Sequence, residues 1–170
     1  MNSNADNTVE RLEHYLYPGR LFASKEPYTV TTVLGSCVAV CFWDPILRVG
    51  GINHYMLPLW NGEGLASPKY GNIAIIKLLD AMLSLGCERR NLVCKVFGGG
   101  EVLRTNGVLN VGQRNVELAM RILAEERLPI VSSNVGGNQG RKLIYNTEDG
   151  SVLMKKLRPQ AEFLANPKVA

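Results

Sequence analysis

The sequence predicts an α+β domain in which packed mixed or antiparallel β-sheets are flanked by two or three helices. Three observations lead to this class: about seven short segments read as strands, most of these strands follow one another directly, and only two segments have the spacing of long helices. A chain of 170 residues suits one such domain, and its composition, 46% hydrophobic and 20% charged, is typical of a globular protein.

The first half of the chain is predicted to be mostly extended. Residues 8–17 are the exception, because their apolar residues have the spacing of a weak helix that ends at a proline-glycine turn. Residues 21–43 are rich in Val, Thr, Tyr and Phe and predict strands that are interrupted at Gly35-Ser36. Residues 48–57 predict a further strand. Residues 58–69 predict a loop of a length that is uncommon without a function.

The second half of the chain is predicted to alternate between helices and strands. Apolar residues at intervals of three and four predict helices over residues 70–85 and 114–127. A strand over residues 92–97 lies between the two helices, and a short strand over residues 130–133 follows the second one. The last predicted element is a hairpin formed by residues 142–146 and 151–157.

These elements predict one domain over residues 20–158, with an N-terminal extension (1–19) that carries the weak helix and a C-terminal tail (159–170). The longest apolar run has six residues, whereas a membrane span needs roughly 18, so no membrane insertion is expected. The N-terminus lacks the cationic start and apolar stretch of a secretory signal, which favours a cytoplasmic location. The net charge of +4 is spread over 19 basic and 15 acidic residues, so nucleic acid is not an expected partner.

Four cysteines occur in the chain, and their spacing matches no common structural role. No two of them form the CxxC pair of a zinc site, and a cytoplasmic protein is not expected to carry a disulfide framework. Free cysteines are commonly buried as small hydrophobic side chains. We therefore expect most of the four to be inert and ask whether one differs.

Cys37 is the cysteine that could be activated, because one of the two histidines, His54, follows in the next predicted strand. If residues 44–47 form a four-residue turn, antiparallel pairing places Cys37 directly opposite His54 on one face. The pair would then act as nucleophile and base, and His54 would hold the pKa of Cys37 below its ordinary value. Two unrelated core residues remain the alternative. A register slip of one residue would oppose Cys37 to Tyr55 instead.

The Gly35-Ser36 break directly before Cys37 strengthens the catalytic interpretation. A glycine permits a sharp turn that leaves the Cys37 side chain and its backbone N–H at the exposed start of a strand. A backbone N–H in that place can stabilise an oxyanion. Ser36 is a second candidate nucleophile, but it has no base of its own.

Three other motifs have a structural and a functional interpretation each. The glycine run 98–100 follows a strand, yet it is not the GxGxxG pattern of a nucleotide site, and a tight turn lining a pocket is favoured. Residues 136–141 form either a substrate loop or a plain turn between strands. Arg114-Asn115 is either part of a functional motif or a solvated first helical turn.

Five segments together resemble the chemoreceptor glutamine deamidase family (CheD). They cover roughly residues 20–157 in the family's order, and the pair of a GSC segment and an NHYMLP segment is highly specific. The segments are TTVLGSCVAV (31–40), GGINHYMLP (50–58), KVFGG (95–99), VGQRN (111–115) and GGNQGR (136–141).

The resemblance implies a cysteine hydrolase that converts selected glutamine side chains of bacterial chemoreceptors to glutamate through a thioester. The family's Cys-His-Thr triad falls on Cys37, His54 and Thr31 of this sequence, with Thr31 six positions before the cysteine. It also implies a fold related to the catalytic domains of glutamine-deamidating toxins, and a reaction that needs no metal or organic cofactor.

The resemblance implies two kinds of partner. The substrate would be the cytoplasmic helices of methyl-accepting chemoreceptors, and an adaptation phosphatase of the CheC family could bind as well. A non-catalytic regulator that binds receptor or phosphatase is the alternative function. The presence of all three triad residue types favours the enzyme.

Overall fold

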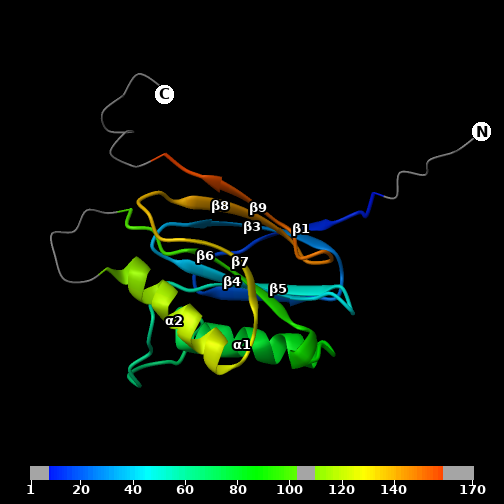
Figure 1. Ribbon diagram of the computed structural model, residues 1–170, viewed down its shortest axis with the longest axis horizontal. Helices are drawn as coiled ribbons and strands as arrows, with labels where there is room; N and C mark the ends of the chain where they lie inside the picture. Colours follow the sequence, from blue (N-terminus) through cyan, green and yellow to red (C-terminus); the bar gives the residue numbers. More distant parts are fainter. Residues whose placement is uncertain (1–7, 103–109, 159–170) are drawn as a thin grey trace, which may run out of the picture.

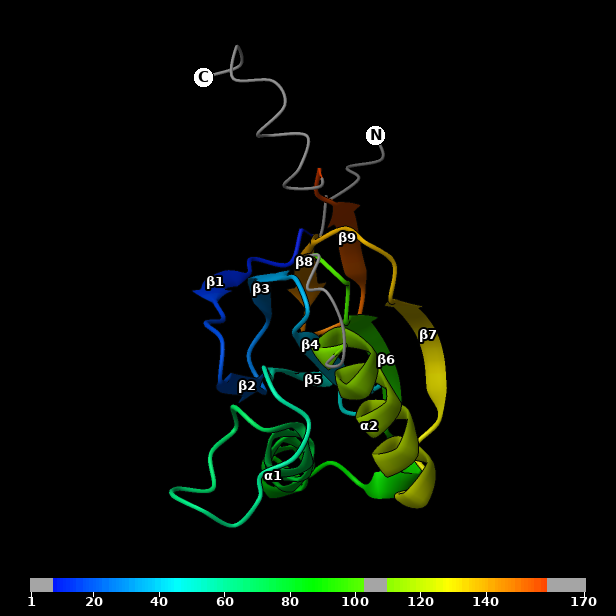
Figure 2. The same cartoon turned by 90° about the vertical axis from the view of Figure 1, so that its left-hand side faces the viewer.

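The computed structural model describes residues 8–102 and 110–158, which form three stacked layers (Figures 1 and 2). A four-stranded sheet lies on a five-stranded sheet, and two helices cover the outer face of the five-stranded one. The α+β class and the two mixed sheets flanked by helices confirm the predicted fold class. No helix within the described ranges is long and apolar enough to cross a membrane.

The four-stranded sheet has the order β1-β3-β8-β9. Strand β1 runs parallel to β3, and the other two pairs are antiparallel. The strands are β1 (Leu12–Tyr15), β3 (Tyr28–Leu34), β8 (Arg141–Asn146) and β9 (Val152–Lys156). Residues from both ends of the chain thus share this sheet.

The five-stranded sheet has the order β2-β5-β4-β6-β7, in which only the β6–β7 pair is parallel. Its strands are β2 (Arg20–Ser24), β4 (Val38–Asp44), β5 (Val49–His54), β6 (Val93–Gly98) and β7 (Ile130–Val135). Helices α1 (Gly71–Ser84) and α2 (Val111–Glu125) pack on its outer face, and a short 3₁₀ turn (Arg89–Asn91) lies between α1 and β6. Every residue of β5 is buried, because both of its faces are covered.

Two hydrophobic cores result from this layering. The first lies between the sheets and includes Leu34, Cys41, Ile52 and Phe97. The second lies between the five-stranded sheet and the helices and includes Val38, Tyr55 and residues from the inner faces of α1 and α2. Since side chains alternate along a strand, odd-numbered positions of the first half of β4 point to the other sheet and even-numbered ones to the helices. Cys37 lies on the side between the sheets.

The two long helices are found where the periodicity predicts them, and α2 begins three residues earlier than expected. Asn110 explains the earlier start: its side chain accepts a hydrogen bond of 3.0 Å from the backbone N–H of Gln113. An N-cap of this kind satisfies one of the unpaired amides in the first turn of a helix.

The helix predicted for residues 8–17 is wrong, because these residues contain β1 instead. Val9 and Leu12 are about half exposed and only Leu16 is buried, so the helical spacing does not correspond to a buried helix face. The backbone gains its hydrogen bonds from β3, which overrides a weak local preference. Within the N-terminal segment, Leu12–Tyr15 therefore form an edge strand of the four-stranded sheet.

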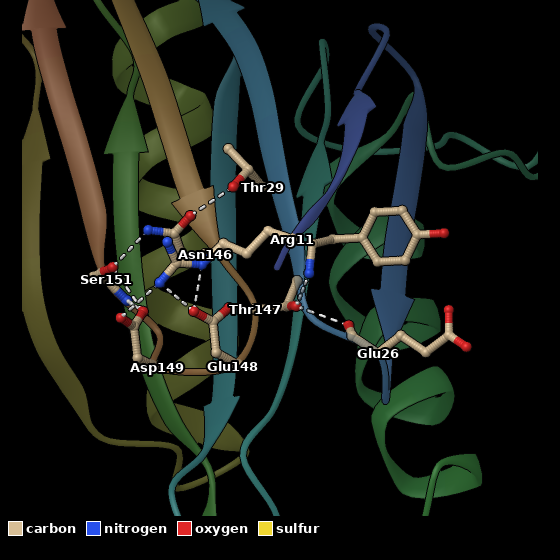
Figure 3. A network of polar contacts seen from close by, with 9 residues as sticks. Arg11, Glu26, Thr29, Asn146, Thr147, Glu148, Asp149 and Ser151 are labelled. Carbon is tan, nitrogen blue, oxygen red and sulfur yellow. Dashed lines mark hydrogen bonds and ion pairs between the residues drawn. The ribbon is translucent and has the colours of Figure 1, made fainter. Parts of the chain in front are cut away.

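A polar network fastens this N-terminal segment to the β8–β9 turn (Figure 3). Arg11 forms an ion pair with Glu148 and lies 3.7 Å from Asp149. In the same turn Thr147 accepts a hydrogen bond from the N–H of Tyr28 and donates one to the carbonyl of Glu26. The network links the start of β1, the start of β3 and the β8–β9 turn.

The β4–β5 hairpin has a register two residues away from the predicted one. Asp44 stays in the strand opposite Val49, and its carboxylate accepts hydrogen bonds from the N–H groups of Ile46 and Leu47. The turn therefore spans residues 45–48 and begins one residue later than expected. A shift by two residues leaves every side chain on the predicted face, because the side-chain period of a strand is two.

Candidate active site

The segment Gly35–Cys37, which we name the nucleophile loop, crosses from β3 in one sheet to β4 in the other. It carries the one cysteine in the described ranges that is not buried: Cys37 is half-buried, whereas Cys41, Cys87 and Cys94 are buried. A cysteine needs access to react with a substrate. Cys37 is therefore the candidate nucleophile on exposure as well as on sequence.

Each carbonyl of the nucleophile loop accepts a hydrogen bond. The N–H of Gly100 donates to Gly35 (3.0 Å), and the N–H of Gly99 donates to Cys37 (2.9 Å). The side-chain amide of Asn115 on α2 donates to Ser36 (3.0 Å). The loop is thus held from β6 and from α2 at three successive residues.

The glycine run 98–100 is needed for this support. A Cβ atom on Gly98 would lie 2.2 Å from the Cys37 carbonyl oxygen, and the φ angle of Gly98 is +108°, which side chains rarely adopt. The run is a tight turn against the nucleophile loop, which agrees with the interpretation favoured over a nucleotide site.

The backbone N–H of Cys37 makes no hydrogen bond to a backbone carbonyl within residues 8–102 and 110–158. It lies near the cysteine's own sulfur, where it lowers the pKa of the thiol, but burial raises that pKa by more. A backbone N–H without a carbonyl acceptor is the kind of donor that can stabilise an oxyanion.

His54 ends β5 and is 1% exposed. Its Nδ1 lies 2.8 Å from the hydroxyl of Thr32, and that hydroxyl donates a hydrogen bond of 2.8 Å to the backbone carbonyl of Leu16. A carbonyl only accepts and a hydroxyl has one proton, so Thr32 must accept from Nδ1–H. The proton of neutral His54 is therefore on Nδ1, and Nε2 carries a free lone pair.

The Nε2 atom of His54 is buried and has no hydrogen-bond partner in the described part of the chain. A buried polar atom without a partner is costly and is commonly tied to catalysis or to a ligand. The tautomer fixed by Thr32 makes this atom a proton acceptor. His54 thus presents a base rather than a second donor.

Cys37 and His54 share the face between the two sheets, but they are not directly opposed. The bridge next to them pairs Val38 with Tyr55, so Cys37 and His54 are diagonal neighbours across the β4–β5 pair. Diagonal residues lie about 7–8 Å apart in an antiparallel pair, closer at Cβ. No hydrogen bond joins them here; catalytic hydrogen bonds often shorten only when substrate is bound.

Thr31 does not occupy the place that the family resemblance suggests. Successive side chains of β3 point to opposite faces, and it is Thr32, fully buried, that contacts His54. Thr31 is its partly exposed neighbour. Val30, Thr32 and Leu34 are the buried positions of β3 and lie two residues apart. This strand period identifies Thr32 as the threonine that points inward.

The pKa directions differ from the expected activated thiolate. Burial lowers the pKa of His54 from 6.5 to about 4, and burial raises the pKa of Cys37. Both shifts favour a neutral thiol beside a neutral imidazole. The expectation of a lowered Cys37 pKa is therefore wrong for the substrate-free protein.

The buried neutral state of His54 predicts a loss of stability in acid. The unfolded chain binds a proton below about pH 6.5, whereas folded His54 resists protonation until about pH 4. The free energy of unfolding should thus fall by about 3 kcal/mol as the pH drops through this window, and should not depend on His54 above it. Urea unfolding of wild type and His54→Gln across this range checks the difference; equal slopes would contradict it.

Asn115 and Arg141 are site-supporting residues whose roles the sequence did not reveal. Asn115 is fully buried rather than solvated. Arg141 is 3% exposed and donates hydrogen bonds to the side chain of Asn134 and to the carbonyls of Gly136 and Gln139. Arg141 therefore organises the turn between β7 and β8, which also contacts the glycine run through a bond from Gly136 to Gly98.

A surface cavity of about 490 Å³ lies between the glycine run, the start of α2 and the turn between β7 and β8. It is lined by Gly99, Glu101, the first turns of α2 and residues 135–138, and neither Cys37 nor His54 lines it. No three His, Cys, Asp or Glu side chains of the described ranges are grouped as metal ligands.

Comparison with known proteins gives matches over most of the chain. The family model described as CheD, chemotactic sensory transduction, matches residues 56–156. The probable chemoreceptor glutamine deamidase CheD of Trichlorobacter lovleyi is 50% identical over 149 residues, covering 87% of this chain and 92% of that protein. Its counterpart in Sulfurimonas denitrificans is 48% identical over 150 residues, covering 86% and 96%.

A solved structure, Bacillus licheniformis hypothetical protein YfiH, gives a TM-score of 0.47 at 15% identity over 76% of this chain and 61% of that one, too distant to bear on activity. The family model and the relatives agree on the same family. The chain belongs to the CheD family.

Proposed function

We propose that this protein is a cysteine hydrolase that deamidates glutamine side chains of chemoreceptors in chemotaxis adaptation, with Cys37 as nucleophile and His54 as base. The observation that carries the proposal is the buried, unpartnered Nε2 of His54, which Thr32 keeps unprotonated on the face that also holds Cys37. The names of the relatives support the substrate class, since they are called chemoreceptor glutamine deamidases.

In the first half-reaction, the Cys37 sulfur attacks the carbonyl carbon of the glutamine side chain while its proton moves to Nε2 of His54. The oxyanion that forms is stabilised by the backbone N–H of Cys37. The imidazolium then gives its proton to the amide nitrogen, and ammonia leaves. The substrate is now a thioester on Cys37.

In the second half-reaction, water replaces ammonia. His54 takes a proton from the water as its oxygen attacks the thioester carbonyl, and the Cys37 sulfur leaves and recovers that proton. The products are glutamate and the original thiol. Thr32, which itself donates to the Leu16 carbonyl, accepts from Nδ1–H in both the imidazole and the imidazolium, which is the third-member role of a triad.

The proposal includes a cytoplasmic location, because the receptor segments that a deamidase of this family acts on are cytoplasmic helices. A CheC-family phosphatase as a second partner is a prediction that rests on the sequence resemblance. Cys37 is half-buried, which suits a glutamine presented by a large protein surface. Contacts away from the reacting atoms must orient that glutamine toward the sulfur.

The proposed activity is tested by incubating the protein with a chemoreceptor cytoplasmic fragment and mapping the fragment by mass spectrometry. Conversion of a glutamine to glutamate raises the peptide mass by about one dalton as the amide is hydrolysed. We expect this change at a few glutamines of the fragment, with free glutamine and short peptides as poor substrates. Equal efficiency on free glutamine would indicate an ordinary amidase, and no change would contradict the proposal.

Thr32→Val is expected to lower the deamidation rate, whereas Thr31→Val is its matched control. Valine keeps the shape of threonine but leaves the Nδ1–H of His54 and the Leu16 carbonyl without their partner. An unpaired buried polar group costs roughly 1–3 kcal/mol, which corresponds to about 5- to 150-fold in rate if catalysis bears it. Initial rates of both variants on the receptor fragment check this. A larger loss in Thr31→Val would contradict the assignment.

A further inference from the structure

Asn115 lies in the first turns of α2, and its side chain is directed at two separate segments next to the reacting residues. Its Nδ2 donates a hydrogen bond of 3.0 Å to the carbonyl of Ser36 in the nucleophile loop. The same nitrogen donates a second bond of 3.0 Å to the carbonyl of Met56. Both protons of one amide are thus spent on two backbone carbonyls.

These two acceptors are placed next to the two reacting side chains. Ser36 directly precedes Cys37, and Met56 lies two residues after His54. The regular β4–β5 ladder ends at the Cys41–Ile52 pair, and beyond it the strands share only the isolated Val38–Tyr55 bridge. Between the ladder and the bridge, the N–H of Val40 is bonded to the side chain of Asn53. Between β4 and β5, the neighbours of Cys37 and His54 are therefore joined by one bridge of two hydrogen bonds and not by a continuous ladder.

The orientation and burial of Asn115 show that the amide is fixed for this contact. Asn115 is 0% exposed, and its Oδ1 is buried without a hydrogen-bond partner in the described ranges. Only the NH₂ group can donate to two carbonyls, so the amide cannot be turned to satisfy Oδ1 instead. Its backbone carbonyl also accepts a bond from the hydroxyl of Tyr55, the residue after His54.

We infer that Asn115 is a positioning residue that sets the separation between Cys37 and His54 by clamping the nucleophile loop to the chain after β5. The expected effect of this residue on turnover rests on the proposed function. A misplacement of about 1 Å between reacting groups can cost about 100-fold in rate, so a clamp at this point acts on turnover more than on substrate binding.

The test compares Asn115→Ala with Asn146→Ala, a control that also removes an amide with two side-chain hydrogen bonds. Asn146 lies at the end of β8, in the other sheet and in the network of Figure 3. The kcat and KM values are measured on the receptor fragment, beside thermal melts. We expect kcat of Asn115→Ala to fall by roughly 10- to 100-fold with KM within about twofold, and kcat of Asn146→Ala to stay near wild type.

A second readout needs no receptor. The rate at which iodoacetamide alkylates Cys37 is measured with and without His54→Ala, in the wild-type and the Asn115→Ala background. His54 should accelerate alkylation in the wild-type background and lose most of that effect when Asn115 is replaced. If Asn115→Ala removes the effect of His54 on alkylation but the wild type deamidates no glutamine, the proposed function fails and the positioning role stands.

The inference is overturned if Asn115→Ala keeps kcat within about twofold of wild type, if Asn146→Ala loses as much, or if the His54 effect on alkylation persists in full. Should Asn115→Ala fail to fold, Asn115→Asp carries the test. A protonated carboxyl fills the same space and supplies at most one of the two donors, so a loss in the same two readouts is again expected. Unchanged values in Asn115→Asp would refute the role.

Discussion

Cys37→Ala is expected to abolish deamidation while the protein remains folded. In the proposed mechanism the sulfur forms the covalent bond to substrate, and removing the nucleophile of a hydrolase that works through an acyl intermediate lowers kcat by roughly 10⁴- to 10⁶-fold. Cys37 is half-buried at the start of β4, so little core volume is lost. Ammonia release from the receptor fragment measures the effect, and a thermal melt confirms folding.

The three remaining cysteines are the matched controls for this experiment. Cys41 and Cys94 pack in the two cores and Cys87 is buried beside α1, so their replacement by alanine acts on packing and not on chemistry. Each control variant should melt at a lower temperature and still deamidate at a rate near wild type. Turnover by Cys37→Ala at a rate close to that of the controls would rule out Cys37 as nucleophile.

His54→Ala is the second variant with a large expected effect. In the proposed mechanism His54 accepts the Cys37 proton and gives it to the amide nitrogen, so losing this base should lower kcat by roughly 10²- to 10⁴-fold. In the wild type, kcat/KM should fall in acid as Nε2 takes up a proton. Because burial lowers the pKa of His54 to about 4, this fall is expected near pH 4 and not at the ordinary value of 6.5.

The pH profile of kcat/KM on the receptor fragment checks the second part of this expectation. Activity that halves near pH 6.5 would mean that His54 is solvated or paired in the free enzyme, which the buried Nε2 does not allow. If kcat/KM does not fall in acid until the protein unfolds, the base in the reaction is not His54.

The sequence correctly predicted that Cys37 and His54 share one face, because the side-chain period of a β-strand is two. The hairpin register was wrong by two residues, yet Cys37 and His54 still share the side between the sheets. A slip by one residue would have separated them. The turn chemistry of Asp44, whose carboxylate accepts from two amides of the turn, is the detail that shifted the register.

The parts of the site that could not be predicted depend on contacts between distant segments. Which threonine meets His54 is decided by the inward face of β3, which selects Thr32, whereas the family motif assigned the role to Thr31. Leu16 reaches Thr32 only because residues 12–15 pair with β3, against their weak helical spacing. For Asn115 the sequence left a functional motif and a solvated first turn open, because its contact with the nucleophile loop depends on how α2 packs.

The pairing of Cys37 with His54 is tested most directly by the pH profile of Cys37 alkylation in wild type and in His54→Ala, read beside a thermal melt of each. We expect wild type to react at least about tenfold faster than the variant near pH 7, and to lose that advantage as His54 is protonated toward pH 4. Two folded proteins with superimposable profiles would show that His54 only packs in the sheet, and would contradict the catalytic pair.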